Sequence, residues 1–188
     1  MAPPTNLPQP ILILEKSIVR PYHLSDAPSM SQAASSKAVA AYLRNRFPHP
    51  YTVADAESWI NMNSTPPIRN WSIVCPTSGR AIGSIGVSQG QDVYSKGYEL
   101  GYWIGEEFWG QGVMSELVPA LVKWVMNGMG EGVEVERVWA GAFSENKASQ
   151  KLLEKSGFQL EGRLRKAVEK KGVVMDEMVY SVIKQDLT

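Results

Sequence analysis

The stretch from Tyr98 to Leu121 constrains the fold more than any other part of the chain. At its start apolar residues occupy every second position, as in a half-buried strand: Tyr98, Leu100, Tyr102 and Ile104. A short turn follows and closes with Gly110-Gln111-Gly112. Beyond it, apolar residues recur at helical spacing. The stretch therefore predicts a strand, a tight glycine turn and a helix over about 112–126, with a kink at Pro119.

A glycine turn that leads into a helix is a place where proteins hold phosphate. The first N–H groups of a helix have no partner within it, and the helix dipole favours negative charge there. Glycine also lets the backbone approach the phosphate closely. The turn lacks the Lys-Ser/Thr pair of a nucleoside-triphosphate loop, and Ser115 stands where a dinucleotide fold has its third glycine. An ordinary corner between a strand and a helix would use the same glycines, so this motif alone leaves both interpretations open.

A second motif lies downstream, from Asn146 to Phe158, and reads NKASQKLLEKSGF. Together with GYWIGEEFWGQGVMSE, it resembles the GNAT superfamily of acetyl-CoA-dependent N-acetyltransferases. The likeness is greatest to the Rim-type branch, which is similar to the enzymes that acetylate ribosomal-protein N-termini. Weaker likeness covers most of the chain, at Arg20-Pro21, Asp26-Ala27, Pro50-Tyr51-Thr52, Glu161-Gly162 and Asp176 to Tyr180.

The resemblance implies a single-domain α/β fold, with a mixed, mostly antiparallel sheet flanked by helices and two splayed central strands. It also implies acetyl-CoA as cosubstrate and no metal. Backbone N–H groups of the glycine turn would hold the pyrophosphate, and the pantetheine arm would lie in the gap between the splayed strands. The residues expected at the cofactor are Trp103, Ile104, Trp109, Gly110, Gln111, Gly112, Val113, Met114, Ser115, Asn146 and Ser149.

Acyl transfer to an amine needs a base, because a primary amine is largely protonated at neutral pH. Glu99 resembles the strand glutamate that serves as base in parts of the superfamily, and a structural glutamate is the alternative. Ser149 could donate a hydrogen bond to the leaving sulfur. Two positions depart from the family: Leu153 replaces the usual tyrosine acid, and Glu107 replaces the Gln or Arg that opens the pyrophosphate loop.

Two functions follow from these residues. The first is direct acetyl transfer to a peptide N-terminus or a small-molecule amine. The second is a catalytically silent module that binds acyl-CoA, which would need the turn but not Glu99. The loop from Arg44 to Tyr51 and the segment from Lys166 to Val173 are expected to form the acceptor walls, as loops often carry specificity. Their lysines and arginines predict a basic rim that disfavours polyamines.

Composition fits one globular domain over residues 11–188, preceded by a proline-rich tail over 1–10. The net charge of zero argues against nucleic acid as a partner. No apolar run reaches the roughly 18 residues of a membrane helix, and the start lacks the features of a signal peptide. We therefore expect a cytoplasmic monomer or homodimer. Cys75 is the single cysteine, and nothing next to it in sequence suggests activation.

The remaining segments predict further elements. Residues 11–20 read as one strand, and Ser25-Asp26 as the cap of a helix over about 26–43. Thr52 and Asp55 form a capping-box pattern that opens a helix to about Met62. Paired strands are expected at 71–75 and 81–88, and single strands at 137–143, 158–165 and 173–184. A helix is expected from Asn146 to Gly157.

Overall fold

The computed structural model describes residues 6–187, so the first half of the predicted tail lies outside the described residues. The strands follow the sheet order β1-β2-β3-β4-β5-β6-β8-β7, and β5 pairs with β6 in the parallel direction. This is the mixed, mostly antiparallel α/β sheet that the sequence predicted. The chain forms two compact units, Met1–Gly86 with Tyr102–Val113, and Val87–Gly101 with Met114–Thr188. They are called the first and second unit below.

The first unit begins with a short hairpin rather than the single strand predicted over 11–20. Leu12 pairs with Val19 and Ile13 with Ile18, and the Leu14 N–H donates to the Ser17 carbonyl. The polar pair Glu15-Lys16 lies in the turn, where alternation of apolar residues is interrupted. The strands here are β1 (Leu12–Ile13), β2 (Ile18–Arg20), β3 (Asn70–Val74) and the first part of β4 (Ala81–Gln89).

The helix predicted over 26–43 is broken in two. A short 3-10 helix, η1 (Leu24–Asp26), leads into α1 (Ala27–Ala34), and α2 (Lys37–Ala41) follows after a break. The Ser36 hydroxyl accepts the Ala38 N–H and so starts a new helix. Asp26 takes the N-cap position of α1, as predicted, but its side chain makes no capping bond there and instead accepts the His23 N–H. The Ser25 N–H donates to the His23 ring. Polar side chains that bond their own backbone explain both differences.

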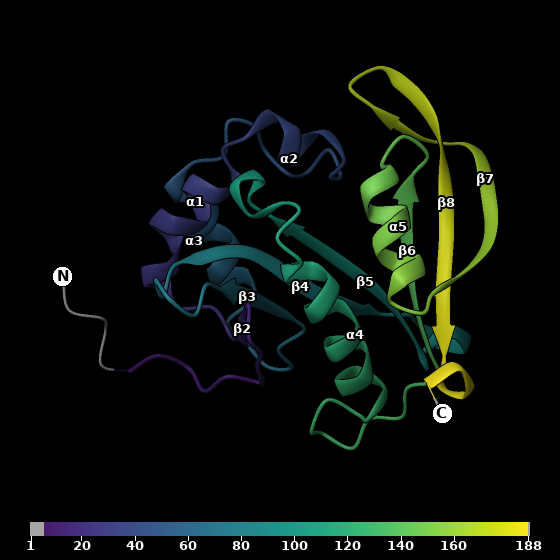
Figure 1. The fold of residues 1–188 in the computed structure, drawn as a ribbon, viewed down its shortest axis with the longest axis horizontal. Coiled ribbons are helices and arrows are strands. Elements are labelled where there is room, and N and C mark those ends of the chain that lie inside the picture. The colour runs from purple at the N-terminus through teal and green to yellow at the C-terminus, as the bar shows by residue number, and fades with distance from the viewer. Residues whose placement is uncertain (1–5, 188) are drawn as a thin grey trace. The chain divides into compact units, whose positions relative to one another are not determined.

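The capping box at Thr52 is confirmed. Its hydroxyl accepts the Asp55 N–H at 3.2 Å, and Asp55 accepts the Thr52 N–H at 2.8 Å, which opens α3 (Val53–Met62). Helices α1 and α3 pack together (Figure 1). Their buried faces join one apolar cluster of the first unit, which includes Tyr22, Met30, Tyr51, Ala56 and Ile60.

The second unit contains the other half of the sheet and two helices. Its elements are η2 (Asp92–Tyr94), most of β5 (Gly97–Ile104), α4 (Val113–Met126), β6 (Arg137–Phe143), α5 (Lys147–Lys155), β7 (Gln159–Lys170), β8 (Val173–Ile183) and η4 (Lys184–Leu187). Helix α4 continues across Pro119, as predicted, while the kink there stays a prediction. Figure 1 shows β7 and β8 as a long hairpin, with α5 beside it.

The segment from Lys166 to Val173 was wrongly predicted as a loop. Strand β7 runs on to Lys170, and Lys171 and Gly172 form the turn to β8 with φ of 50° and 82°. Two left-handed residues suit the twist of a tight hairpin. Lys170 is buried, and the loss of water lowers the pKa of its ammonium. Lys170 therefore cannot contribute to an exposed basic rim. Lys166 and Lys171 are exposed.

Among residues 6–187, no helix has the length and apolar character required to span a bilayer.

Candidate functional site

The segment between β5 and α4 is a tight loop held by its own backbone. It includes a short 3-10 helix, η3 (Glu106–Phe108), and the Trp109 N–H donates to the Glu106 carbonyl at 3.0 Å. The Trp109 indole N–H reaches back to the Ile104 carbonyl at 3.0 Å, which brings these two predicted cofactor residues together. The loop is thus anchored at the end of β5, before its glycines.

The two glycines of this loop both have a left-handed backbone conformation. Gly110 and Gly112 have φ of 72° and 80°, in the left-handed region that strains other residues. In the described part of the chain, the N–H groups of Gly110, Gln111 and Gly112 donate to no protein atom. A run of N–H groups without acceptors at a helix start fits an anionic group such as a pyrophosphate.

The charged residues of the loop have partners at the surface of the first unit. Glu106 accepts a hydrogen bond from the Ser36 hydroxyl. Glu107, which departs from the family pattern, lies 3.9 Å from Arg80, and both side chains are exposed. The positive charge of Arg80 offsets part of the repulsion that Glu107 would exert on a phosphate.

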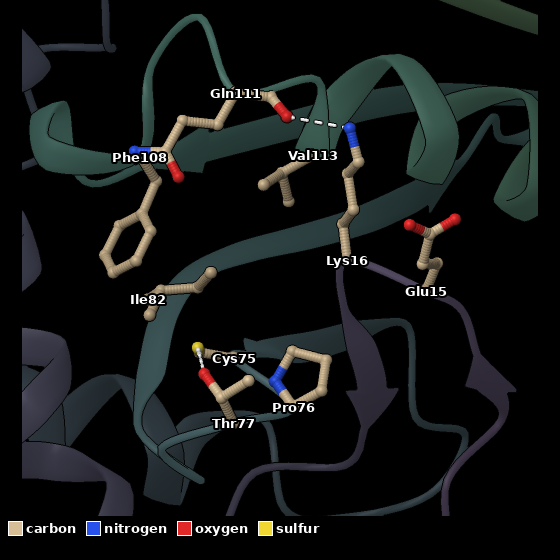
Figure 2. A pocket seen from close by; sticks show the side chains of 9 residues that line it. All are labelled: Glu15, Lys16, Cys75, Pro76, Thr77, Ile82, Phe108, Gln111 and Val113. Carbon is tan, nitrogen blue, oxygen red and sulfur yellow. Dashed lines mark hydrogen bonds between the residues drawn. The ribbon is translucent and has the colours of Figure 1, made fainter.

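Lys16 is a feature of this loop that sequence reasoning missed. Its ammonium donates to the Gln111 carbonyl at 3.0 Å, across 95 positions of sequence. Figure 2 shows this bond among the side chains that line a cavity. The volume of the cavity is about 260 Å³. The cavity is lined by Glu15, Lys16, Cys75, Pro76, Thr77, Ile82, Phe108, Gln111 and Val113. No local pattern could have revealed the contact, because a lysine in a hairpin turn normally faces water.

Cys75 lies in the same cavity, just after β3, and its chemistry differs from the prediction. Hydrogen bonds from Ser78 and Thr77 lower the pKa of the thiol to about 7, and the sulfur lies 3.2 Å from the Thr77 hydroxyl. The expectation that nothing activates Cys75 was therefore wrong. The responsible hydroxyls follow two and three residues later in the turn, so they were visible in the sequence.

Trp103 belongs to an aromatic group in the first unit. Phe47 stacks on Tyr51 with ring centroids 4.8 Å apart, and its edge meets Trp103 at 5.6 Å. The loop from Arg44 to Tyr51 thus packs against the central strand, where the sequence predicted an acceptor wall. Arg44 and Arg46 remain exposed.

Glu99 lies in the second unit, at the last paired position of β5 with β6. The parallel register of β5 with β6 joins Gly97 to Arg137 and ends at Glu99 opposite Trp139. Both strands continue beyond these paired positions, and the splay between them stays a prediction. The Glu99 side chain is half-buried, so it has partial access to water.

Asn146 is the N-cap of α5, as predicted. Its side-chain oxygen accepts the Ser149 N–H at 3.1 Å, which brings these two candidates together. Within the described residues, the Asn146 side-chain nitrogen donates to no protein atom, so it can still serve a ligand. Leu153 is fully buried, and it fills a core position rather than lining a site.

The two other predicted cofactor residues lie in the first turn of α4, where Met114 is half-buried and Ser115 exposed. No group of three or more His, Cys, Asp or Glu side chains that could hold a metal occurs between residues 6 and 187.

Comparison with known proteins decides the family. The model of the acetyltransferase (GNAT) domain matches residues 16–159. This chain belongs to the GNAT acetyltransferase family. An uncharacterized N-acetyltransferase of Bacillus subtilis, YoaA, is 29% identical over 177 residues, which are 93% of this chain and 97% of that protein. The GNAT chain described here is therefore an N-acetyltransferase.

Solved structures agree with the GNAT fold. RimL, a ribosomal L7/L12 α-N-protein acetyltransferase in complex with coenzyme A, has a TM-score of 0.78 at 21% identity, and the match covers 93% of this chain and 98% of RimL. The microcin C7 self-immunity acetyltransferase MccE, in complex with acetyl-CoA and AMP, has a TM-score of 0.74 at 20% identity, with coverage of 90% and 93%. The predicted Rim-type likeness is confirmed at the level of the fold.

Proposed function

We propose that this GNAT protein uses acetyl-CoA and transfers the acetyl group directly to a primary amine, without an acyl-enzyme. The glycine loop carries this proposal. Its positive φ values at Gly110 and Gly112 and its N–H groups without protein acceptors form a place for the pyrophosphate. The CoA and acetyl-CoA complexes of RimL and MccE support the same cosubstrate.

In this mechanism Glu99 is the general base. It takes the proton of the bound ammonium, directly or through a water molecule, and so frees the lone pair for attack on the thioester carbonyl. A half-buried carboxylate at the last paired position of β5 with β6 suits that role. A backbone N–H of β5, near Trp103 and Ile104, would polarise the carbonyl oxygen.

The leaving thiolate needs a proton or a hydrogen bond. Leu153 cannot supply one, because it is an apolar side chain buried in the core. Ser149 is the hydroxyl donor that the same motif offers, four positions before Leu153 in the sequence. Asn146 holds the Ser149 backbone N–H through the capping bond. We assign Ser149 to the sulfur and Asn146 to the pantetheine arm.

The acceptor is proposed to be a peptide N-terminus or a neutral small amine. Phe47, Tyr51 and Trp103 offer aromatic surface next to the central strand, which favours an acceptor with an apolar part. Exposed Arg44 and Arg46 would repel a polycation. A reducing compartment such as the cytoplasm, and a monomer or homodimer, belong to the same proposal.

The test is a screen of N-terminal peptides, amino acids, polyamines and aminoglycosides, in which thiol release from acetyl-CoA is measured. We expect the best turnover on a peptide or a neutral amine. Spermine or an aminoglycoside as best substrate would contradict the acceptor assignment. A melting temperature that saturating acetyl-CoA leaves unchanged would contradict the cosubstrate, since a ligand of the native state must stabilise it.

The catalytically silent acyl-CoA-binding module that the sequence left open is an outcome of this test, since the buried Leu153 replaces the family's tyrosine acid. Tight binding of acetyl-CoA without turnover on any acceptor would support this alternative.

A further inference from the structure

Lys16 makes a contact that the proposed function does not yet use. It lies in the turn of the β1–β2 hairpin, and its ammonium donates to the Gln111 carbonyl at 3.0 Å. Figure 2 shows the side chain reaching from the hairpin to the glycine loop. The end of this side chain also lies against Gly112, where an added Cβ would be 2.9 Å from the Lys16 nitrogen.

The carbonyl that Lys16 holds determines where the next N–H points. A trans peptide is planar, so the Gln111 C=O and the Gly112 N–H point in opposite directions. This peptide is trans, because the cis bonds in the described chain precede Pro50 and Pro67. With its carbonyl turned toward Lys16, the peptide aims the Gly112 N–H away from the lysine.

Within the loop, the Gln111 side-chain amide donates to the Glu107 carbonyl at 2.6 Å, which holds the side chain but not the peptide that follows it. Gly112 follows the peptide directly and Gly110 lies just before Gln111, and glycine accepts both signs of φ. A flip would replace the Gly112 N–H with the Gln111 carbonyl oxygen. That oxygen would repel the phosphate, so the loop needs a contact from outside to favour one orientation.

We propose that Lys16 is a positioning residue for the pyrophosphate of acetyl-CoA. It acts through the Gln111–Gly112 peptide, whose N–H it directs toward the phosphate. The inference rests on the proposed function, because it needs a CoA pyrophosphate at this loop. If Lys16 has this role, it should affect the affinity for ligands that carry the pyrophosphate. It should have no effect on the rate of acetyl transfer from the thioester.

Lys16→Met tests the inference, because it keeps the length of the side chain and removes the donor. We expect its KM for acetyl-CoA to rise roughly fivefold to tenfold, as a charge-assisted hydrogen bond is lost, with kcat within about twofold of the wild type. Lys16→Arg retains a donor and should restore most of the affinity. Lys37→Met removes an exposed lysine of α2 in the same unit and should leave KM unchanged.

The ligand series separates positioning from other roles. Dephospho-CoA keeps the pyrophosphate but lacks the 3′-phosphate. In Lys16→Met its Kd should therefore rise by the same factor as the Kd of CoA. Acetyl-pantetheine has no pyrophosphate, and its KM should not change. A loss confined to CoA would show a direct contact with the 3′-phosphate, and an equal loss for acetyl-pantetheine would show general damage. Either result overturns the proposal.

Failure of this inference can be distinguished from failure of the proposed function. Wild-type protein that binds neither CoA nor dephospho-CoA would refute the cosubstrate. Wild-type protein that binds both, with Lys16→Met binding them equally well, would refute only the role of Lys16.

Discussion

Arg20 and Asp26 form a buried ion pair with two parallel contacts, which joins the end of β2 to the start of α1. The distances from Nη1 to Oδ2 and from Nη2 to Oδ1 are 2.8 and 2.6 Å, and both side chains are 4% exposed. Asp26 also accepts the His23 N–H. The carboxylate therefore orders the entry to the helical part of the first unit.

Asp26→Asn should destabilise the protein strongly. The change leaves the Arg20 guanidinium buried without its counter-charge, which typically costs about 3–5 kcal/mol. Urea unfolding would measure the free energy of unfolding. Asp92→Asn is the control, because Asp92 is exposed at the start of η2 and asparagine tolerates its φ of 53°. A loss below about 1 kcal/mol for Asp26→Asn would show that the pair contributes little.

Gly112→Ala should abolish the stabilisation of the protein by acetyl-CoA. The added Cβ strains a residue with φ of 80° and displaces the Lys16 ammonium. Gly79→Ala is the matched control, since Gly79 has φ of 67° with nothing within 4 Å of the added atom. Both variants should lose similar intrinsic stability, of the order of 1–2 kcal/mol. Only Gly112→Ala should lose the rise in melting temperature that acetyl-CoA causes. An equal rise in both variants would contradict the assignment of this loop to the pyrophosphate.

Glu99→Gln should lower kcat by roughly 100-fold at neutral pH if Glu99 is the base. The deficit should shrink as pH rises, because the amine then loses its proton without help. Steady-state rates from pH 6 to 10 measure this effect, and Glu116→Gln, on α4, is a control variant. If Glu99→Gln has the pH–rate profile of the wild type, another group is the base.

Cys75 should react with iodoacetamide at lower pH than an ordinary thiol. Hydrogen bonds from Ser78 and Thr77 favour the thiolate and lower the pKa of Cys75 to about 7, so the rate should reach half its maximum near pH 7. Ser78→Ala should move this midpoint toward the usual value of about 8.5. Mass spectrometry of the alkylated protein reports the rate, and a midpoint above pH 8 in the wild type would be inconsistent with the geometry.

The free energy of unfolding should depend on pH through Glu161, which lies in the second unit. Hydrogen bonds from Arg137 and Ser181 lower the pKa of its carboxyl to about 2. The ionised Glu161 therefore stabilises the fold fully at pH values above the ordinary pKa of a glutamate, about 4.5. This stabilisation is lost as pH falls from there toward 2. Glu161→Gln should be less stable than the wild type at pH 6, and the difference in urea midpoints should narrow by pH 3. A constant difference would exclude titration of Glu161.

Several elements of the fold were predictable because their signals are local. The alternation from Tyr98 to Ile104, the capping box at Thr52 and the cap at Asn146 each act within a few residues. Interactions over such short spans follow from the residue types and their spacing. The likeness to the GNAT family then assigned roles to Glu99 and Ser149, and these roles remain predictions.

Other features depend on residues that only the folded chain brings together. Lys16 meets Gln111 across 95 positions, Phe47 meets Trp103, and Lys170 is buried within a long hairpin. None of these contacts leaves a periodic pattern, because each joins segments whose separation in sequence is arbitrary. By itself the sequence determined that a strand, a glycine turn and a helix follow one another from Tyr98 to Leu121. Tertiary structure decided which distant side chain holds that loop, since a peptide flanked by glycines has no strong local preference for one orientation.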